Sequence, residues 1–216
     1  MDIIKSDASE LFILGDLFDF WFEYKTVIPR GYVRLLGKLA ELSDSGIKVH
    51  MFTGNHDMWM FNYFPEELGI EITRKPIETE INGLQIMIAH GDGLGPGDHG
   101  YKFIKKVFAN KVCQWLFARL HPNFAIGLGL FFSRRSRLAR GDSDYEYKGD
   151  EKERLIVYTK NILEKKHFDL FIFGHRHYPL DMKISGNSRY INLGDWIYNF
   201  TYAVLDGQQF ELKKFE

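Results

Sequence analysis

The sequence has little that would place the chain in an oxidising compartment or inside a bilayer. It contains one cysteine, Cys113, which excludes an internal disulfide framework and favours a cytoplasmic location. It has no charged-then-apolar leader, and its longest apolar stretches, such as residues 125–132, are far shorter than the roughly 18 residues of a spanning helix. We therefore expect a soluble or peripheral protein. Its 216 residues, 45% of them hydrophobic, suffice for a single domain, 1–216, with a sizeable core.

Net charge is nearly absent, at −1, but the charges are unevenly distributed. Residues 101–140 contain nine Lys or Arg, no Asp or Glu, and many aromatic residues. A basic, aromatic segment of this kind is a candidate surface for an anionic partner. We do not expect this partner to be nucleic acid. In the alternative interpretation, the aromatic residues pack on the core and the charges are merely solvated.

Runs of strand length and helical periodicity alternate along the chain. A strand at 10–14, a helix within 31–46 and a strand at 47–54 are expected. Strand–helix–strand with short connections is the building block of a parallel sheet, so a mixed α/β fold with antiparallel additions is predicted. Helical insertion into this fold is expected at 98–148. The other expected elements are a hairpin at Asn82-Gly83, helical structure over 98–140 interrupted at Pro122, Gly127 and Gly129, a helix within 150–166, a strand at 169–174 and short strands in the tail.

Carboxylate, amide or imidazole side chains follow four of the strand-like runs, usually beside a glycine. In open α/β sheets, ligands bind beyond the carboxyl ends of the strands, and glycine lets the backbone approach a ligand closely. Asp, Asn and His together suit a divalent ion such as Mn, Fe or Zn. Each residue alone has a structural explanation as a turn former, cap or surface histidine, but four such strand ends rarely arise by chance. The four are Gly15-Asp16, Gly54-Asn55-His56-Asp57, His90-Gly91-Asp92 and Gly174-His175-Arg176-His177.

These motifs resemble those of the calcineurin-like metallophosphoesterases, whose pattern is D-x-H, G-D, G-N-H-[DE], H and G-H-x-H. The resemblance covers nearly the whole chain from Glu10 onward. It implies a two-sheet α/β sandwich, a dinuclear divalent metal site, expected to hold Mn²⁺, and phosphoester hydrolysis. In "ILGDLFDFW", "HGDGLGPGDHGYKFIKKVF" and the basic insertion, the chain is similar to a branch of the family that hydrolyses the pyrophosphate bond of a nucleotide-sugar lipid.

The resemblance implies metal ligands at the matching positions. Asp16 would bridge two metals, because a carboxylate has two oxygens. Asn55, His90 and His175 would complete one metal site, and His177 would serve the other. Two cations neutralise an anionic phosphate, polarise its P–O bond and activate water.

The resemblance also implies catalytic and substrate-binding residues. His56 would stabilise charge on the leaving oxygen, and Asp57 would orient it. Asp98 and Tyr101 match positions that line the nucleotide-sugar site. Asp19 has no ligand role in the pattern and is interpreted as a supporting residue. The aromatic residues of the insertion would shelter the acyl chains of a lipid substrate. The basic residues of 101–140 would meet the anionic headgroups of a membrane surface, which implies a peripheral location on the cytoplasmic side of the inner membrane.

One block of the family pattern is missing, because no histidine of this sequence has an aspartate two positions before it. We expect the first strand and most of the first helix to be absent, which indicates a truncated chain more than a naturally short one. The His177 site would then keep two ligands, so one ion per chain, impaired hydrolysis and a homodimer through an exposed sheet edge are expected. Two other functions stay open: a phosphodiesterase or phosphatase for another substrate, and a catalytically weak metal-binding protein.

Overall fold

The computed structural model describes residues 1–140 and 145–216, without the side chains of residues 139 and 140. Part of the predicted insertion, 141–144, and the side chain of Arg140 therefore lie outside the described residues. The chain divides into two compact units, each described by itself below: Met1–Arg74 with Lys105–Leu138, and Lys75–Ile104 with Ala139–Glu216. The predicted mixed α/β class is confirmed, while the single domain 1–216 and the insertion bounds 98–148 stay predictions.

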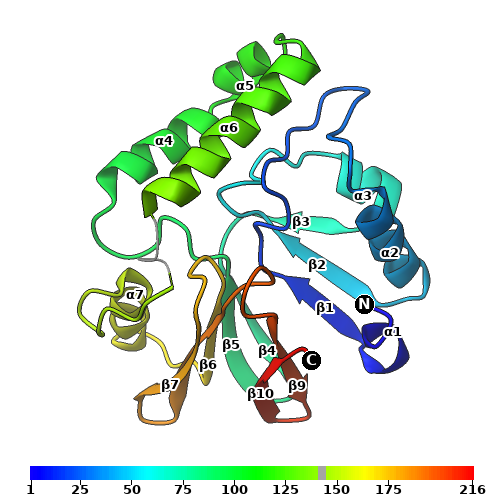
Figure 1. The fold of residues 1–216 in the computed structure, drawn as a ribbon. Helices are drawn as coiled ribbons and strands as arrows, with labels where there is room; N and C mark the ends of the chain where they lie inside the picture. Colours follow the sequence, from blue (N-terminus) through cyan, green and yellow to red (C-terminus); the bar gives the residue numbers. More distant parts are fainter. Residues whose placement is uncertain (141–144) are drawn as a thin grey trace. The chain divides into compact units, whose positions relative to one another are not determined.

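The sheet of the first unit consists of three parallel strands in the order β1-β2-β3 (Figure 1). Helix α2, Val33–Asp44, joins β1 to β2 and buries Leu36, Leu39 and Leu42, which follow helical periodicity. Ile13 pairs with Met51, so the segments after β1 and β2 leave the sheet at the same edge. The strands are β1 Glu10–Ile13, β2 Lys48–Phe52 and β3 Glu71–Thr73.

A buried carboxylate connects the segment after β1 to helix α3. Glu23 is 8% exposed. It belongs to the segment 21–23, which is hydrogen-bonded through its backbone to residues 56–59. Its side chain satisfies backbone donors at the start of α3, Tyr63–Leu68, which have no partner within the helix. The donors are Trp21 Nε1 at 3.1 Å and the backbone nitrogens of Phe61, Asn62 and Tyr63 at 2.6, 2.7 and 3.1 Å. Glu23 therefore caps α3 from a distant part of the sequence.

The second unit contains a five-stranded sheet in the order β4-β5-β6-β8-β7 and a separate two-stranded sheet, β9-β10. Strands β5, β6 and β8 are parallel, while β4 and β7 are antiparallel additions at the edges. Ala89 pairs with Phe173, so the residues after β5 and β6 leave the sheet side by side. The elements are β4 Ile77–Ile81, β5 Leu84–Ala89, α7 Arg154–Leu163, β6 Leu170–Phe173, β7 Pro179–Ser185, β8 Ser188–Leu193, β9 Thr201–Asp206 and β10 Gln209–Lys214.

The hairpin predicted at Asn82-Gly83 is confirmed between β4 and β5. Both residues have positive φ, 54° and 82°, which is the geometry that a two-residue turn of type I′ requires. Gly207, with φ 56°, follows β9 in the same way and turns the chain into β10. Short-range turn chemistry was thus sufficient to predict the turn at Asn82-Gly83.

Three helices follow β5: α4 His99–Ala109, α5 Lys111–Phe117 and α6 Pro122–Arg140, with the short α1, Ile4–Asp7, at the start of the chain. The predicted interruption at Pro122 is confirmed, because α5 ends at Phe117 and α6 begins at Pro122, but the predicted interruptions at Gly127 and Gly129 are wrong, because α6 is one helix through both glycines. Pro122 is its first residue, where no intrahelical N–H is needed. Gly129 lets the helix backbone approach Phe20: a Cβ at this position would lie 2.4 Å from the phenyl ring.

Among the described residues, none of the helices combines the length and the apolar character that crossing a membrane requires.

Candidate functional site

The loops after β1 and β2 contact each other through two glycines. Gly15 has φ +83°, and a Cβ at this position would lie 2.6 Å from the backbone nitrogen of Gly54. A Cβ at Gly54 would lie 2.1 Å from Oδ1 of Asp16. This close approach lets the backbone N–H of His56 donate to Asp16 Oδ1 at 2.8 Å. Two motifs that lie 40 residues apart therefore form one polar cluster in the first unit.

Asp57 joins the same two loops from within the core. It is fully buried, and its two carboxylate oxygens accept from the backbone nitrogens of Gly54 at 2.6 Å and Leu17 at 2.8 Å. Loss of these donors would leave a buried carboxylate without hydrogen-bond partners, which costs free energy of folding. The two bonds therefore hold both loops in place. The role predicted for Asp57, to orient His56, stays a prediction. In the structure, Asp57 accepts a hydrogen bond from one backbone nitrogen of each loop.

The side chain of His56 contacts helix α6. Its Nδ1 lies 2.9 Å from Oγ of Ser133, which is 7% exposed. The backbone carbonyl of His56 accepts from Trp21 N at 3.2 Å. Asp19, predicted as a supporting residue, accepts from Arg137 Nη2 at 2.6 Å, also on α6. Helix α6 thus holds the side chains of His56 and Asp19.

In the second unit, two predicted ligands lie together at the ends of β5 and β6. His90 is 4% exposed, and its ring centroid is 5.1 Å from that of His175. A ring nitrogen of each residue lies within 4.8 Å of one of the other. The backbone nitrogen of Gly174 donates to the carbonyl of His90 at 3.0 Å, which fixes the two strand ends. Two imidazoles at this separation can ligate a common cation.

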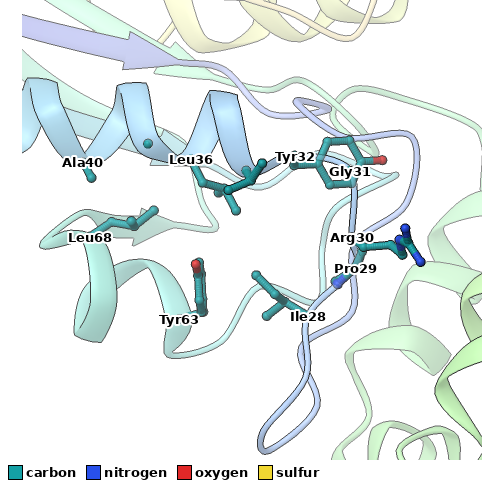
Figure 2. A pocket seen from close by; sticks show the side chains of 11 residues that line it. Ile28, Pro29, Arg30, Gly31, Tyr32, Leu36, Ala40, Tyr63 and Leu68 are labelled. Atoms are coloured by element: carbon teal, nitrogen blue, oxygen red, sulfur yellow. The ribbon is translucent and has the colours of Figure 1, made fainter.

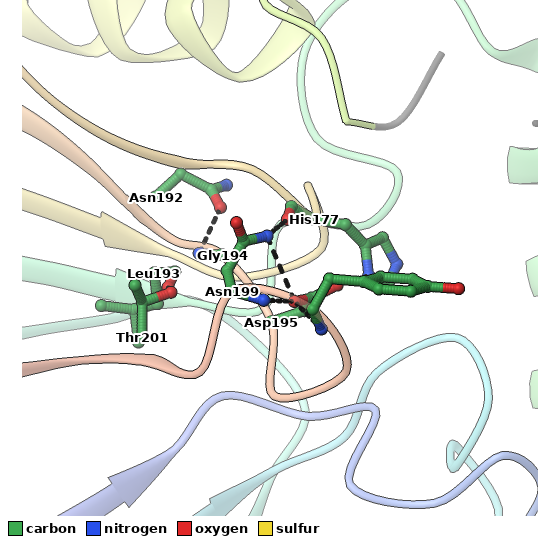
Figure 3. A network of polar contacts seen from close by, with 8 residues as sticks. His177, Asn192, Leu193, Gly194, Asp195, Asn199 and Thr201 are labelled. Carbon is green, nitrogen blue, oxygen red and sulfur yellow. Dashed lines mark hydrogen bonds and ion pairs between the residues drawn. The ribbon is translucent and has the colours of Figure 1, made fainter. Parts of the chain in front are cut away.

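The third predicted histidine of this unit, His177, contacts an acid that the sequence analysis did not select. Its Nδ1 lies 3.3 Å from Oδ2 of Asp195 (Figure 3). Oδ1 of Asp195 accepts from the backbone nitrogens of Tyr198 and Asn199 at 3.0 and 2.9 Å, and the Asn199 side chain donates to the carbonyl of His177 at 2.6 Å. A carboxylate on Nδ1 orients Nε2 for ligation, which is the usual arrangement behind metal-binding histidines.

The environment of Asp195 keeps it ionised. Burial alone would raise the pKa of this carboxyl, but the hydrogen bonds from the backbone of Asn199 and Tyr198 and from His177 together lower it. An ionised carboxylate can accept hydrogen bonds on both oxygens. In Asp195, Oδ2 faces the ring of His177 and Oδ1 accepts from the backbone nitrogens of Tyr198 and Asn199. A sequence pattern could have found this residue, since Gly194-Asp195 follows β8 just as Gly15-Asp16 follows β1.

Arg176, which separates the two histidines of the G-H-R-H motif in the sequence, forms an ion pair with the buried Glu153. Nη2 of Arg176 is 3.2 Å from Oε1 of Glu153 and 2.9 Å from the carbonyl oxygen of Glu146. Glu153 is 4% exposed and precedes helix α7. The guanidinium also lies 5.3 Å from the ring of Tyr178. Burial raises the pKa of the Tyr178 hydroxyl to about 12, so this ring stays neutral.

The two residues predicted to bind substrate lie close together in the second unit. Asp98 accepts from Nη1 of Arg154 at 2.6 Å, and the hydroxyl of Tyr101 donates to the buried carboxylate of Asp92. Both side chains are fixed by partners in their own unit. Arg154 adds a guanidinium, the group that binds phosphate most effectively, to this region.

The first unit also contains an apolar pocket of about 550 Å³ between α2, α3 and the segment before α2 (Figure 2). The side chains that line it include Ile28, Leu36 and Leu68, with Tyr32 and Tyr63 among them. The described lining residues include no carboxylate, imidazole or thiol. The pocket therefore lacks the groups that bind a metal or carry out hydrolysis.

Comparison with known proteins gives a single family. Residues 1–179 match the family model described as calcineurin-like phosphoesterase. The chain belongs to the calcineurin-like phosphoesterases. It is accordingly a metal-dependent phosphoesterase, and imidazole side chains such as those at the ends of β5 and β6 are suitable ligands for a divalent cation.

Two proteins that are similar to this chain share a name. UDP-2,3-diacylglucosamine hydrolase of Porphyromonas gingivalis is 37% identical over 228 residues, which cover 100% of this chain and 87% of the relative. The hydrolase of the same name from Tolumonas auensis is 29% identical over 215 residues, 95% of this chain and 83% of the relative. The likeness thus extends beyond the metal motifs into the helical segment.

Proposed function

We propose that this phosphoesterase hydrolyses the pyrophosphate bond of UDP-2,3-diacylglucosamine, giving UMP and 2,3-diacylglucosamine 1-phosphate. The observation that carries the proposal is the 37% identity to the Porphyromonas gingivalis hydrolase along the whole chain. Attack occurs at the α-phosphorus of the nucleotide. The cytoplasmic face of the inner membrane is the proposed location, because the lipid substrate resides in a membrane.

The metal ligands in this proposal are the motif residues of both units. Asp16, Asn55, His90 and His175 would hold one ion. In the family pattern His177 would serve a second ion with Asp16, and with these two ligands alone that second ion is expected to bind weakly or not at all. Mn²⁺ is the proposed native metal, since mixed nitrogen and oxygen ligands suit it. When bound, the metal supplies Lewis acidity toward phosphoryl oxygens and activates water as the nucleophile.

The remaining motif residues position and neutralise the substrate. His56 meets the leaving oxygen and stabilises its developing charge, which contributes most when the imidazole is held in place beforehand. Asp57 keeps the loop that carries His56 attached to the loop that carries Asp16. Asp98 and Tyr101 orient the nucleotide sugar.

The test compares two substrates under the same conditions. UMP release from UDP-2,3-diacylglucosamine is expected to show kcat/KM at least about 100-fold above hydrolysis of bis-p-nitrophenyl phosphate, because binding of the remote uridine and acyl groups assists the reaction. In water labelled with heavy oxygen, the label is expected in UMP. Faster hydrolysis of the simple diester, or label only in the sugar phosphate, would favour a different phosphodiesterase activity.

The helices α4 to α6 are proposed to shelter the acyl chains and to contact the anionic membrane surface. The support is their combination of exposed aromatic side chains with basic residues, since Phe103, Trp115, Phe124, Phe131 and Phe132 are all exposed. Large exposed apolar surface next to positive charge is typical of membrane-binding helices.

Charge reversal on α6 is expected to weaken binding to anionic vesicles. Arg134 and Arg135 are exposed, so the double variant Arg134→Glu/Arg135→Glu removes two favourable contacts of about 1 kcal/mol each and should lower vesicle binding roughly thirty-fold or more. The control Lys152→Glu/Lys165→Glu makes the same change of net charge at exposed positions elsewhere. Vesicle flotation measures binding, and equal binding of both double variants and the unaltered protein would contradict the membrane proposal.

Two further expectations stay predictions. One ion per chain is expected because the sequence contains no D-x-H motif. Metal analysis that finds two ions together with full turnover would contradict this expectation.

A homodimer is expected because, among the described strands, β1 pairs with β2 alone and so presents an edge. Light scattering measures the mass in solution, and a monomer would contradict the expectation.

A further inference from the structure

Helix α6 presents one face to the loops that carry the candidate catalytic residues. Ala125, Gly129, Ser133 and Arg137 follow each other at intervals of four residues, so they share a face of the helix. Ala125 is fully buried, and Gly129 packs on Phe20. Ser133 and Arg137 make polar contacts one and two turns further on. This face is distinct from the exposed aromatic and basic residues of the same helix.

We propose that Ser133 is a positioning residue that holds the imidazole of His56 in its reactive orientation. Oγ of Ser133 is 2.9 Å from Nδ1 of His56, and Ser133 as a residue is only 7% exposed, so water competes little for this bond. The backbone nitrogen of His56 is fixed at the same time by Asp16 Oδ1 at 2.8 Å. The residue is thus held at its backbone by one loop and at its ring by α6.

The hydrogen bond selects both the ring orientation and the nitrogen that meets the substrate. The last side-chain torsion of histidine is broad and nearly two-fold, so packing alone leaves two ring orientations close in energy. A partner on Nδ1 distinguishes them and assigns the contact with the leaving oxygen to Nε2. When the serine hydroxyl donates to Nδ1, Nε2 carries the proton and can donate to that oxygen.

Other contacts keep Ser133 at the right distance. Arg137, one turn further along α6, donates to Asp19 at 2.6 Å, three residues after Asp16. The indole Nε1 of Trp59 donates to the carbonyl oxygen of Phe108, at the end of α4, at 2.9 Å. The catalytic loops and the inserted helices are therefore joined at several points. The insertion would act on catalysis directly, besides any role in lipid binding.

The test uses Ser133→Ala, with Ser133→Thr as the variant that keeps the hydroxyl. The inference rests on the proposed role of His56, so His56→Ala and the double variant are measured with them. Ser133→Ala is expected to lower kcat about tenfold to a hundredfold with KM changed less than twofold, because a misoriented imidazole affects the transition state only. Ser133→Thr should recover most of the rate. Ser185→Ala, the same substitution at an exposed position on β7, is the control and is expected to keep the rate.

The outcomes separate this inference from the proposed function. In the His56→Ala background, Ser133→Ala should change kcat less than about twofold, since its effect passes through the imidazole. A full additional loss there, or full activity of Ser133→Ala while His56→Ala is inactive, would overturn the inference and leave the proposed role of His56 intact. Full activity of His56→Ala would overturn both. Nitrogen chemical shifts of the His56 ring should report a change of tautomer population in Ser133→Ala, which a purely structural role would not produce.

Discussion

Replacing His90 by alanine is expected to remove bound metal and to lower turnover by at least about a thousandfold, because metal ions both activate the nucleophile and neutralise the phosphate. His90 is 4% exposed at the end of β5, and its ring is next to that of His175. The hydrogen bond from the backbone nitrogen of Gly174 to the carbonyl of His90 fixes both strand ends. If His90 is removed, His175 therefore cannot move into its place as a ligand. Metal content per chain and UMP release are the measurements.

A matched histidine separates this effect from a general effect of the substitution. His167 is exposed, and its partner is Asp169 at 3.1 Å, an exposed pair of the kind that contributes little to stability. His167→Ala is therefore expected to keep the metal and the rate. If His90→Ala also kept its metal content and its turnover, the assignment of this histidine as a ligand would be wrong.

The second large effect is expected on stability. Glu23→Ala should lower the free energy of unfolding by about 3–5 kcal/mol, because it leaves one buried and three part-buried donors without their acceptor. These donors are the indole of Trp21 and the three backbone nitrogens that begin α3. Urea denaturation followed by tryptophan fluorescence measures the loss. Amide exchange at residues 61–63 should accelerate first, since these amides lose their partner directly.

Two acidic residues provide the comparison for Glu23. Glu23→Gln keeps the shape and one acceptor oxygen, so a smaller loss of about 1–2 kcal/mol is expected. Glu67 lies on the exposed face of α3, and Glu67→Ala is expected to change stability by less than about 0.5 kcal/mol. Equal stability of Glu23→Ala and Glu67→Ala would show that the capping of α3 by Glu23 contributes nothing.

Local chemistry explains which predictions were confirmed. The strands, the crossover helix α2 and the turn at Asn82-Gly83 follow from periodicity and backbone preference, which neighbouring residues alone determine. The error at Gly127 and Gly129 has the opposite origin. Glycine weakens an isolated helix, but at Gly129 the missing side chain lets α6 pack against Phe20, and that tertiary contact outweighs the local preference.

The sequence by itself determined which residue types follow each strand and that these strands pair in parallel. Parallel pairing brings the ends of neighbouring strands to the same edge, so Asp16 and His56 share one edge of a sheet and His90 and His175 share one edge of another. Only the tertiary structure decided which side chains hold these residues. Ser133 reaches His56 across 77 positions, and Asp195 reaches His177 across 18. A hydrogen bond of about 3 Å depends on how whole elements pack, and that packing is a sum over many distant contacts which no local pattern records.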